Sequence, residues 1–314
     1  LTAVAQTRDI LAGRPEYHEF ELRLSGDLGE YRVEVRSSLA GEATGEFLNP
    51  LPARRTEALW SIVAQPADEV VAIKEMGREL FHAVFQGTVL EVFRKALDQA
   101  ERDPRSAGLR IKLVVNAPDL LGLPWEFLYD DERGGFLALY KKTSLMRYVE
   151  QPTAIRELGQ VQRLRLLVVV SSPADLPPLD VKRELQAIRE ALGPWQLKGW
   201  LEYDVAEGRH ATADGLRELL LANTYHVFHY VGHGAIDRGE GLLWLEGADG
   251  SKEAVTASEL ARLLGDEKEL RLVFLNACET AGAAQVAPFA SVANELVKVN
   301  VPAVVATLSR ISDR

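Results

Sequence analysis

Cysteine and excess positive charge are what this sequence most clearly lacks. Its 314 residues include one cysteine, Cys278, which excludes an internal disulfide and a zinc cluster built from cysteines. The 36 Lys and Arg are outnumbered by 46 Asp and Glu, for a formal net charge of −10. A nucleic-acid-binding face needs clustered positive charge, and a membrane span needs an apolar run of ~18 residues, which the chain does not contain. No secretory signal opens the sequence. We therefore expect a cytoplasmic protein that binds neither nucleic acid nor membrane.

The two ends of the sequence predict a piece of a longer fold. The chain opens on Leu1 rather than Met, and it closes on "VPAVVATLSRISDR". This closing stretch is typical of a strand followed by the start of a helix, because Ser312 and Asp313 suit an N-cap. We expect further C-terminal helices, so that truncation, disorder and processing at Arg314 all stay open.

The first half predicts an α+β region. Hydrophobic residues make up 47% of the chain, enough for a real core. The alternation in 17–36 predicts an antiparallel hairpin with one wet face. Apolar residues at helical spacing predict helices in 54–65 and 68–101, the second interrupted at Gly77 or Gly87. A strand at 108–117 and a turn, aromatic cluster and hairpin over 121–139 follow.

The second half has a different rhythm, and the weak pattern over 151–163 separates the two. We expect an accessory region at residues 1–150 and a second domain at 151–314. Strands alternate with helices in the second, which predicts an α/β fold with a mostly parallel sheet covered by helices on both faces. The expected strands are the run "LRLLVVVSSP" at 164–173, 200–205, 225–231, 271–277 and 303–307, with a hairpin near 241–254. The expected helices are 180–192, 212–222, 256–265 and 286–298.

Two apolar strands stop at residues that carry chemistry. "HVFHYVGHG" reaches His233 between two glycines, and "LVFLNAC" reaches Cys278. The carboxyl ends of parallel strands lie on one edge of a sheet, so if these strands are neighbours the two side chains emerge together. An imidazole can take the proton of a thiol and later protonate a leaving amine. The backbone N–H groups of Gly234 and Cys278 are candidate donors for an oxyanion, and the flanking glycines would let a substrate backbone approach closely.

Structural interpretations of the same residues stay open. A lone cysteine is most often a small buried hydrophobe, and a histidine inside a strand is most often a packed one. His226, His229 and His233 do not form a convincing metal site, because residues three apart on a strand face opposite sides. Three carboxylates near strand ends, Asp175, Asp204 and Asp237, are weak candidates for recognising a basic substrate side chain.

The combined motifs resemble one family. "HVFHYVGHG", "LNACETAG", "LRLLVVVSSPADLPPLDVKREL" and "FASVANELVKVNVPAVVAT" look like CHAT-domain sequences, the bacterial relatives of caspases and separase in clan CD of the cysteine peptidases. "LPWEFLYDDERGGFLAL" resembles the segment that precedes the protease half in many members. The likeness extends from about residue 17 to the C-terminus.

The resemblance implies a caspase-like endopeptidase that uses a His–Cys dyad and no cofactor. His233 would be the general base and acid, Cys278 the nucleophile, and residues 1–150 a degenerate caspase-like or accessory half. Such proteases often cleave a dedicated protein partner, for example a gasdermin-like pore former, in bacterial defence or regulated cell death, and they often accompany a sensor module.

Two other functions are weighed against this one. A catalytically silent scaffold would bind partner proteins through the same cleft, although the presence of both dyad residues disfavours it. A nucleotide-binding α/β protein would need a phosphate loop of the GxxxxGK[ST] or GxGxxG type, and the sequence has neither.

Overall fold

The computed structural model describes residues 16–27, 29–52, 69–150, 158–237, 240–277 and 288–307. The chain folds as two compact units, Leu1–Glu150 and Gln151–Arg314. No helix in the described ranges is long and apolar enough to cross a membrane. The helix predicted over 54–65 lies outside the described residues.

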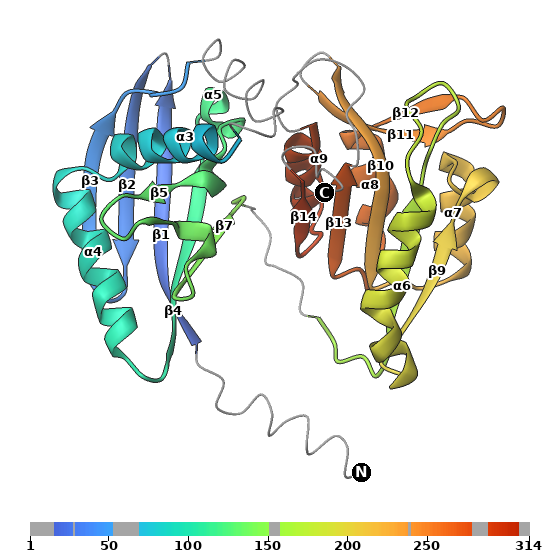
Figure 1. The fold of residues 1–314 in the computed structure, drawn as a ribbon, viewed down its shortest axis with the longest axis horizontal. Coiled ribbons are helices and arrows are strands. Elements are labelled where there is room, and N and C mark those ends of the chain that lie inside the picture. The colour runs from blue at the N-terminus through green and yellow to red at the C-terminus, as the bar shows by residue number, and fades with distance from the viewer. Residues whose placement is uncertain are drawn as a thin grey trace. The chain divides into compact units, whose positions relative to one another are not determined.

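The first unit is built on a five-stranded sheet in the order β3-β2-β1-β4-β7 (Figure 1). The predicted hairpin over 17–36 is confirmed as β1 and β2, which pair antiparallel, and Phe20, Leu22 and Leu24 are fully buried on one face. β1 also pairs in parallel with β4. The strands are β1 (Glu16–Asp27), β2 (Glu30–Ser37), β3 (Gly41–Phe47), β4 (Ser106–Val115) and β7 (Thr143–Arg147).

The helical run predicted at 68–101, with an interruption at Gly77 or Gly87, forms two helices, α3 (Glu69–Val84) and α4 (Gly87–Arg102). The break falls at Gly87, whose φ of 48° is left-handed and therefore suits glycine. Gly77 does not break α3. A Cβ at Gly77 would lie 1.8 Å from the carbonyl oxygen of Phe127, so this glycine lets the helix pack directly on a backbone.

The segment after β4 forms the predicted turn, aromatic cluster and hairpin. Trp125 is fully buried, and its indole Nε1–H donates to the carbonyl of Leu120 at 2.8 Å. Arg147 binds both carboxylate oxygens of Glu126, at 2.7 and 2.9 Å. The elements here are α5 (Pro118–Leu121), the 3-10 turns Trp125–Phe127 and Leu137–Leu139, β5 (Tyr129–Asp130) and β6 (Gly135–Phe136), which pair antiparallel.

The second unit confirms the predicted α/β fold. Five strands pair in parallel in the order β9-β8-β10-β13-β14, and β10 continues into an antiparallel extension with β11 and β12. The strands are β8 (Leu164–Val170), β9 (Leu201–Ala206), β10 (Val227–Asp237), β11 (Glu240–Glu246), β12 (Lys252–Thr256), β13 (Leu272–Ala277) and β14 (Val304–Ala306). The helices are α6 (Val181–Leu197), α7 (Ala213–Ala222), α8 (Ala257–Gly265) and α9 (Pro288–Lys298), with one 3-10 turn at Gly208–His210.

The two faces of this sheet are covered by different helices (Figure 1). Leu185 and Ile188 of α6 pack with Val231 on one face. Helices α7, α8 and α9 contribute to a larger core on the other face, which also holds Tyr230. Because neighbouring residues of a strand point to opposite faces, this division shows which face each β10 side chain meets.

Candidate active site

The sequence predicts that this strand ends at the Gly-His-Gly motif. In the structure, strand β10 continues through the motif and changes its pairing partner there. It pairs in parallel with β13 as far as Gly232, opposite Ala277. From His233 onward it pairs antiparallel with β11, beginning opposite Trp244. The motif is therefore the point at which the parallel sheet passes into the hairpin extension.

The glycines around His233 serve packing inside the protein, which corrects the expectation that they leave room for a substrate backbone. A Cβ at Gly232 would lie 2.2 Å from the hydroxyl oxygen of Tyr230. A Cβ at Gly234 would lie 2.4 Å from Cε1 of Phe289 in α9. Two buried aromatic side chains thus occupy the space on that face of the strand, and only glycine fits beside them.

His233 lies on the face that α6 covers. Tyr230, Gly232 and Gly234 face the opposite core, and alternation along the strand places Val231 and His233 together. The imidazole is fully buried, with 0% of the residue exposed. The carbonyl of His233 accepts from the Tyr230 hydroxyl at 2.9 Å, which fixes the backbone at the change of partner.

Cys278 follows Ala277 in the sequence and lies outside the described residues. Its strand β13 is the direct neighbour of β10, as the sequence-based argument requires. The register sets Gly232 opposite Ala277, so His233 and Cys278 each come one residue after a matched pair. Gly234 is described and buried within β10, opposite Leu243 of β11.

Asn276 is a polar residue that the sequence analysis passed over. It stands in the apolar strand β13 opposite Val231, and its side chain shares the face of His233 by alternation. Its amide oxygen Oδ1 is buried and meets no hydrogen-bond donor among the described residues. A buried amide without such a partner is costly, so a polar group inside "LVFLNAC" was a usable signal of a site.

Two other histidines have structural roles: His226, just before β10, and His229, inside it. Nδ1 of His226 accepts from the backbone N–H of Arg165 at 2.9 Å, and burial lowers the pKa of this histidine. His229 packs edge-to-face on Phe274, with ring centroids 4.7 Å apart, and burial lowers its pKa to about 4. Both are therefore neutral at pH 7. Across the described ranges, no three His, Cys, Asp or Glu side chains are grouped as a metal site.

Asp204 lies in the body of β9 rather than at its end, and its carboxylate is engaged. Oδ2 accepts from Nη2 of Arg165 at 2.8 Å and from the Tyr225 hydroxyl at 2.9 Å. Burial of the phenol, together with the Asp204 carboxylate, raises the pKa of Tyr225. Asp204 thus connects β9 to β8 through Arg165 and to the segment just before β10 through Tyr225, which is a structural role.

Asp175 and Asp237 both lie near the carboxyl edge of the sheet. Asp175 is in the loop after β8 and accepts from the backbone N–H of Lys252 at 2.7 Å. Asp237 is the exposed last residue of β10, opposite Glu240. The structure thus brings Asp175 to the hairpin, and it leaves Asp237 facing solvent.

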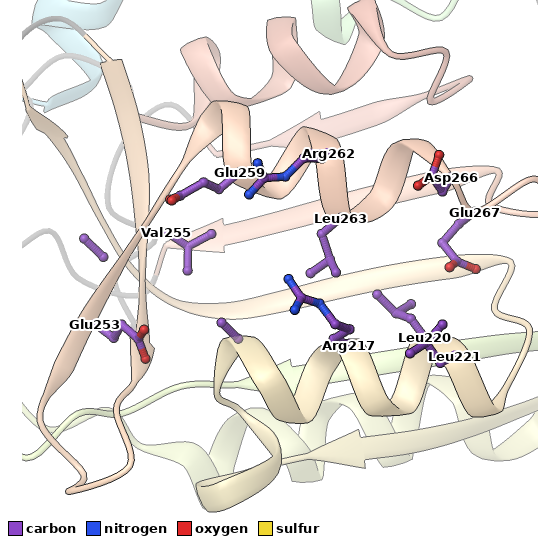
Figure 2. A pocket seen from close by; sticks show the side chains of 12 residues that line it. Arg217, Leu220, Leu221, Glu253, Val255, Glu259, Arg262, Leu263, Asp266 and Glu267 are labelled. Atoms are coloured by element: carbon purple, nitrogen blue, oxygen red, sulfur yellow. The ribbon is translucent and has the colours of Figure 1, made fainter.

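A groove of about 440 Å³ lies between α7 and α8, on the face opposite α6 (Figure 2). Arg217 and Arg262 extend over its middle from the two helices, and Asp266 and Glu267 stand at one end. Burial and the nearby Asp266 raise the pKa of Glu267. The described residues that line this groove include none of the predicted site residues, so it is separate from the candidate active site.

Comparison with known proteins gives one result. The family profile of the CHAT domain matches residues 54–314, which covers about two thirds of the first unit and all of the second. A search of curated proteins found no match to the chain.

Proposed function

Because the chain belongs to the CHAT family, whose members are related to caspase-like cysteine peptidases, we propose that it is a cysteine endopeptidase. In this proposal His233 is the general base and acid, and Cys278 is the nucleophile.

The observation that carries the proposal is the pairing of Gly232 with Ala277. These residues lie opposite each other on neighbouring parallel strands, and the residue that follows each of them in the sequence is a member of the proposed dyad. A histidine and the only cysteine of the chain, each following one of these paired residues in the sequence, are the residue types that acyl transfer by a dyad requires.

The proposed reaction proceeds in two steps. His233 accepts the thiol proton as the sulfur of Cys278 attacks the scissile carbonyl, and the resulting oxyanion is held by the backbone N–H groups of Gly234 and Cys278. The C–N bond breaks as His233 protonates the leaving amine, which leaves a thioester. Water, deprotonated by His233, then attacks the thioester and releases the acid and the thiol.

The target class follows from the family alone. We extend the proposal to a dedicated protein partner and to a role in bacterial defence or regulated cell death. The resemblance of the motifs to bacterial CHAT proteases supports this extension. A sensor module that governs the activity belongs to the same extension.

The complete burial of His233 is the observation that favours a second candidate, a silent scaffold. A base with no exposed surface cannot touch a substrate until the residues above it move. A peptidase must therefore open this site before it works, whereas a scaffold need not.

Cleavage of candidate partners separates the two. The protein and its Cys278→Ala and His233→Ala variants are incubated with proteins encoded beside the gene, and cuts are read by mass spectrometry. We expect cuts from the wild type and from the control Glu218→Gln, which changes an exposed carboxylate on α7, and none from the two dyad variants. Thermal unfolding checks that each variant is folded.

A thiol-reactive probe completes the test. Cys278 is the only cysteine, so an iodoacetamide adduct on a thiol reports this residue. Labelling that is lost in a folded His233→Ala variant supports a competent dyad, even where no partner is cut. Cys278 that stays inert in the folded wild type, with no cuts, overturns the peptidase and supports the scaffold.

A further inference from the structure

Trp244 is the cross-strand partner of His233. The two residues are directly opposite in the antiparallel pair of β10 and β11, so their side chains lie on the same face of the sheet. Residues in such pairs have Cβ atoms about 4.5–5.5 Å apart. Leu243 and Leu245, which flank Trp244, belong to the core on the other face, and this agrees with the placement. An indole therefore stands beside the proposed catalytic imidazole.

The backbone of Trp244 is held firmly. Its carbonyl accepts from the hydroxyl of Ser171 at 2.8 Å and from the hydroxyl of Tyr230 at 2.7 Å. The same Tyr230 hydroxyl contacts the carbonyl of His233, so one side chain ties both members of the pair.

The loop that follows β8 is fastened to the hairpin around this indole. The backbone N–H of Ser172 donates to the carboxylate of Glu246 at 3.1 Å, and the N–H of Ala174 donates to the carbonyl of Gly250 at 3.0 Å. Asp175 accepts from the N–H of Lys252 at 2.7 Å. Three hydrogen bonds between this loop and this hairpin hold both in place and form a wall beside Trp244. Because the wall is already ordered, a ligand that binds against it loses little conformational entropy of the protein.

The ring itself differs from its neighbour in exposure. Trp244 is half-buried, whereas His233 is fully buried. The Lys252 ammonium lies 5.3 Å from the centre of the indole and 3.8 Å from the Asp175 carboxylate. The cation lies over the ring and is thus shared between the ring and a carboxylate, and the indole is the large apolar side chain of this wall.

We propose that Trp244 is a specificity-determining residue, against which a large apolar side chain adjacent to the scissile bond packs. The inference rests on the proposed peptidase function. It names the substrate class as peptides with an aromatic or branched aliphatic residue next to the cut. A flat indole on a rigid wall selects such side chains because it buries much of their surface without ordering a flexible group.

The test measures cleavage of a synthetic peptide library in which the residues on both sides of the central bond are varied. Wild type, Trp244→Ala and Trp244→Phe are compared with Trp195→Ala. Trp195 is also part-exposed, but it lies in the last turn of α6 and is not part of the proposed wall. Its carbonyl accepts from the backbone N–H of Trp200. We expect Trp244→Ala to lose about 10- to 100-fold in kcat/KM on apolar peptides, with Trp244→Phe intermediate and Trp195→Ala unchanged.

A second measurement keeps the inference falsifiable where peptides are not cut. Cys278 is labelled with iodoacetamide and with peptidyl chloromethyl ketones that carry Phe or Asp. We expect the wild type to favour the Phe reagent over the Asp reagent, and Trp244→Ala to lose this preference while its iodoacetamide rate is unchanged.

The outcomes distinguish a failure of the proposed peptidase function from a failure of the proposed role of Trp244. Peptides cut by Cys278→Ala as well as by the wild type would overturn the cysteine-peptidase function, because the thiol would then not be the nucleophile. Cuts that need Cys278 but keep the same preference in Trp244→Ala would overturn only the role of Trp244. A wild type that reacts equally with the Phe and Asp reagents, whether or not it cuts peptides, would also overturn that role.

Discussion

The ring of Phe289 fills the space that a side chain on Gly234 would need, since a Cβ there would lie 2.4 Å from Cε1. Phe289 belongs to α9, the helix that follows Cys278 in the chain, and Gly234 follows His233. This contact ties the strand that carries the histidine to the helix beyond the cysteine, so it helps to hold the two parts of the candidate site together.

Gly234→Ala is expected to destabilise the second unit. The added methyl must displace a fully buried ring, and overpacking of this kind costs about 1–3 kcal/mol. Urea unfolding measures the loss. Gly159→Ala is the matched control, because a Cβ there meets nothing within 4 Å, and it should change stability by less than about 0.5 kcal/mol. Partial rescue of Gly234→Ala by Phe289→Leu would identify the ring as the cause, and equal stability of the two alanine variants would refute it.

Asp204→Asn is expected to reduce stability while leaving any cleavage preference unchanged. The substitution weakens the bonds from Arg165 and Tyr225, and a part-exposed pair of this type contributes about 1 kcal/mol. Unfolding in urea and cleavage of the peptide library are compared with Glu218→Gln, whose carboxylate is exposed on α7. A selective loss of cleavage beside basic residues, at unchanged stability, would instead return Asp204 to the list of substrate-recognition residues.

The alternation of strands and helices could be predicted from the sequence because each element of the second unit has a strong local signal. The continuous apolar run of β8 and the capped start of α8 are examples, and in α8 both bonds of a capping box between Thr256 and Glu259 are present. The predicted end of α6 was five residues too early, since the helix continues past Pro194 to Leu197. β3 was missed because "GEATGEF" shows no apolar alternation.

The candidate site was predicted only in part, for a physical reason. Local patterns identify a histidine and a cysteine at the ends of apolar runs, but they do not reveal what lies across from them. Trp244 lies opposite His233 because of the antiparallel register between β10 and β11. Asn276 lies on the same face of the sheet as His233 because of the parallel register between β10 and β13. The role of the glycines was misread for the same reason, because Phe289 comes from a helix far away in the sequence.

The stability of the second unit is expected to fall as the pH drops from about 6.5 towards 4, through His229. Burial lowers its pKa to about 4 from the usual 6.5, so the folded state holds the neutral form and the unfolded state binds the proton first. Protonation on unfolding therefore favours the unfolded state below pH 6.5, by up to about 3 kcal/mol. His226, whose pKa burial also lowers, acts in the same direction.

Urea unfolding of the wild type and His229→Gln at pH 7 and pH 4.5 isolates this contribution from that of the carboxylates. Glutamine does not titrate, so the variant should lose less stability than the wild type between the two pH values. Parallel losses in the two proteins would mean that His229 is already solvated, or charged, in the folded state.

Activity is expected to need a reducing agent and neutral or mildly alkaline pH, and to be unaffected by a chelator. The working species in the proposed reaction is the thiolate of Cys278, and its fraction grows as the pH approaches the usual thiol range near 8.5. Cleavage of the peptide library is measured with and without dithiothreitol and with EDTA, and adducts on Cys278 are followed by mass spectrometry. Activity should fall in proportion to alkylation, because the chain has no other cysteine to report. If EDTA abolished cleavage and zinc restored it while Cys278 stayed unmodified, a metal-bound water would be the nucleophile and the dyad would be wrong.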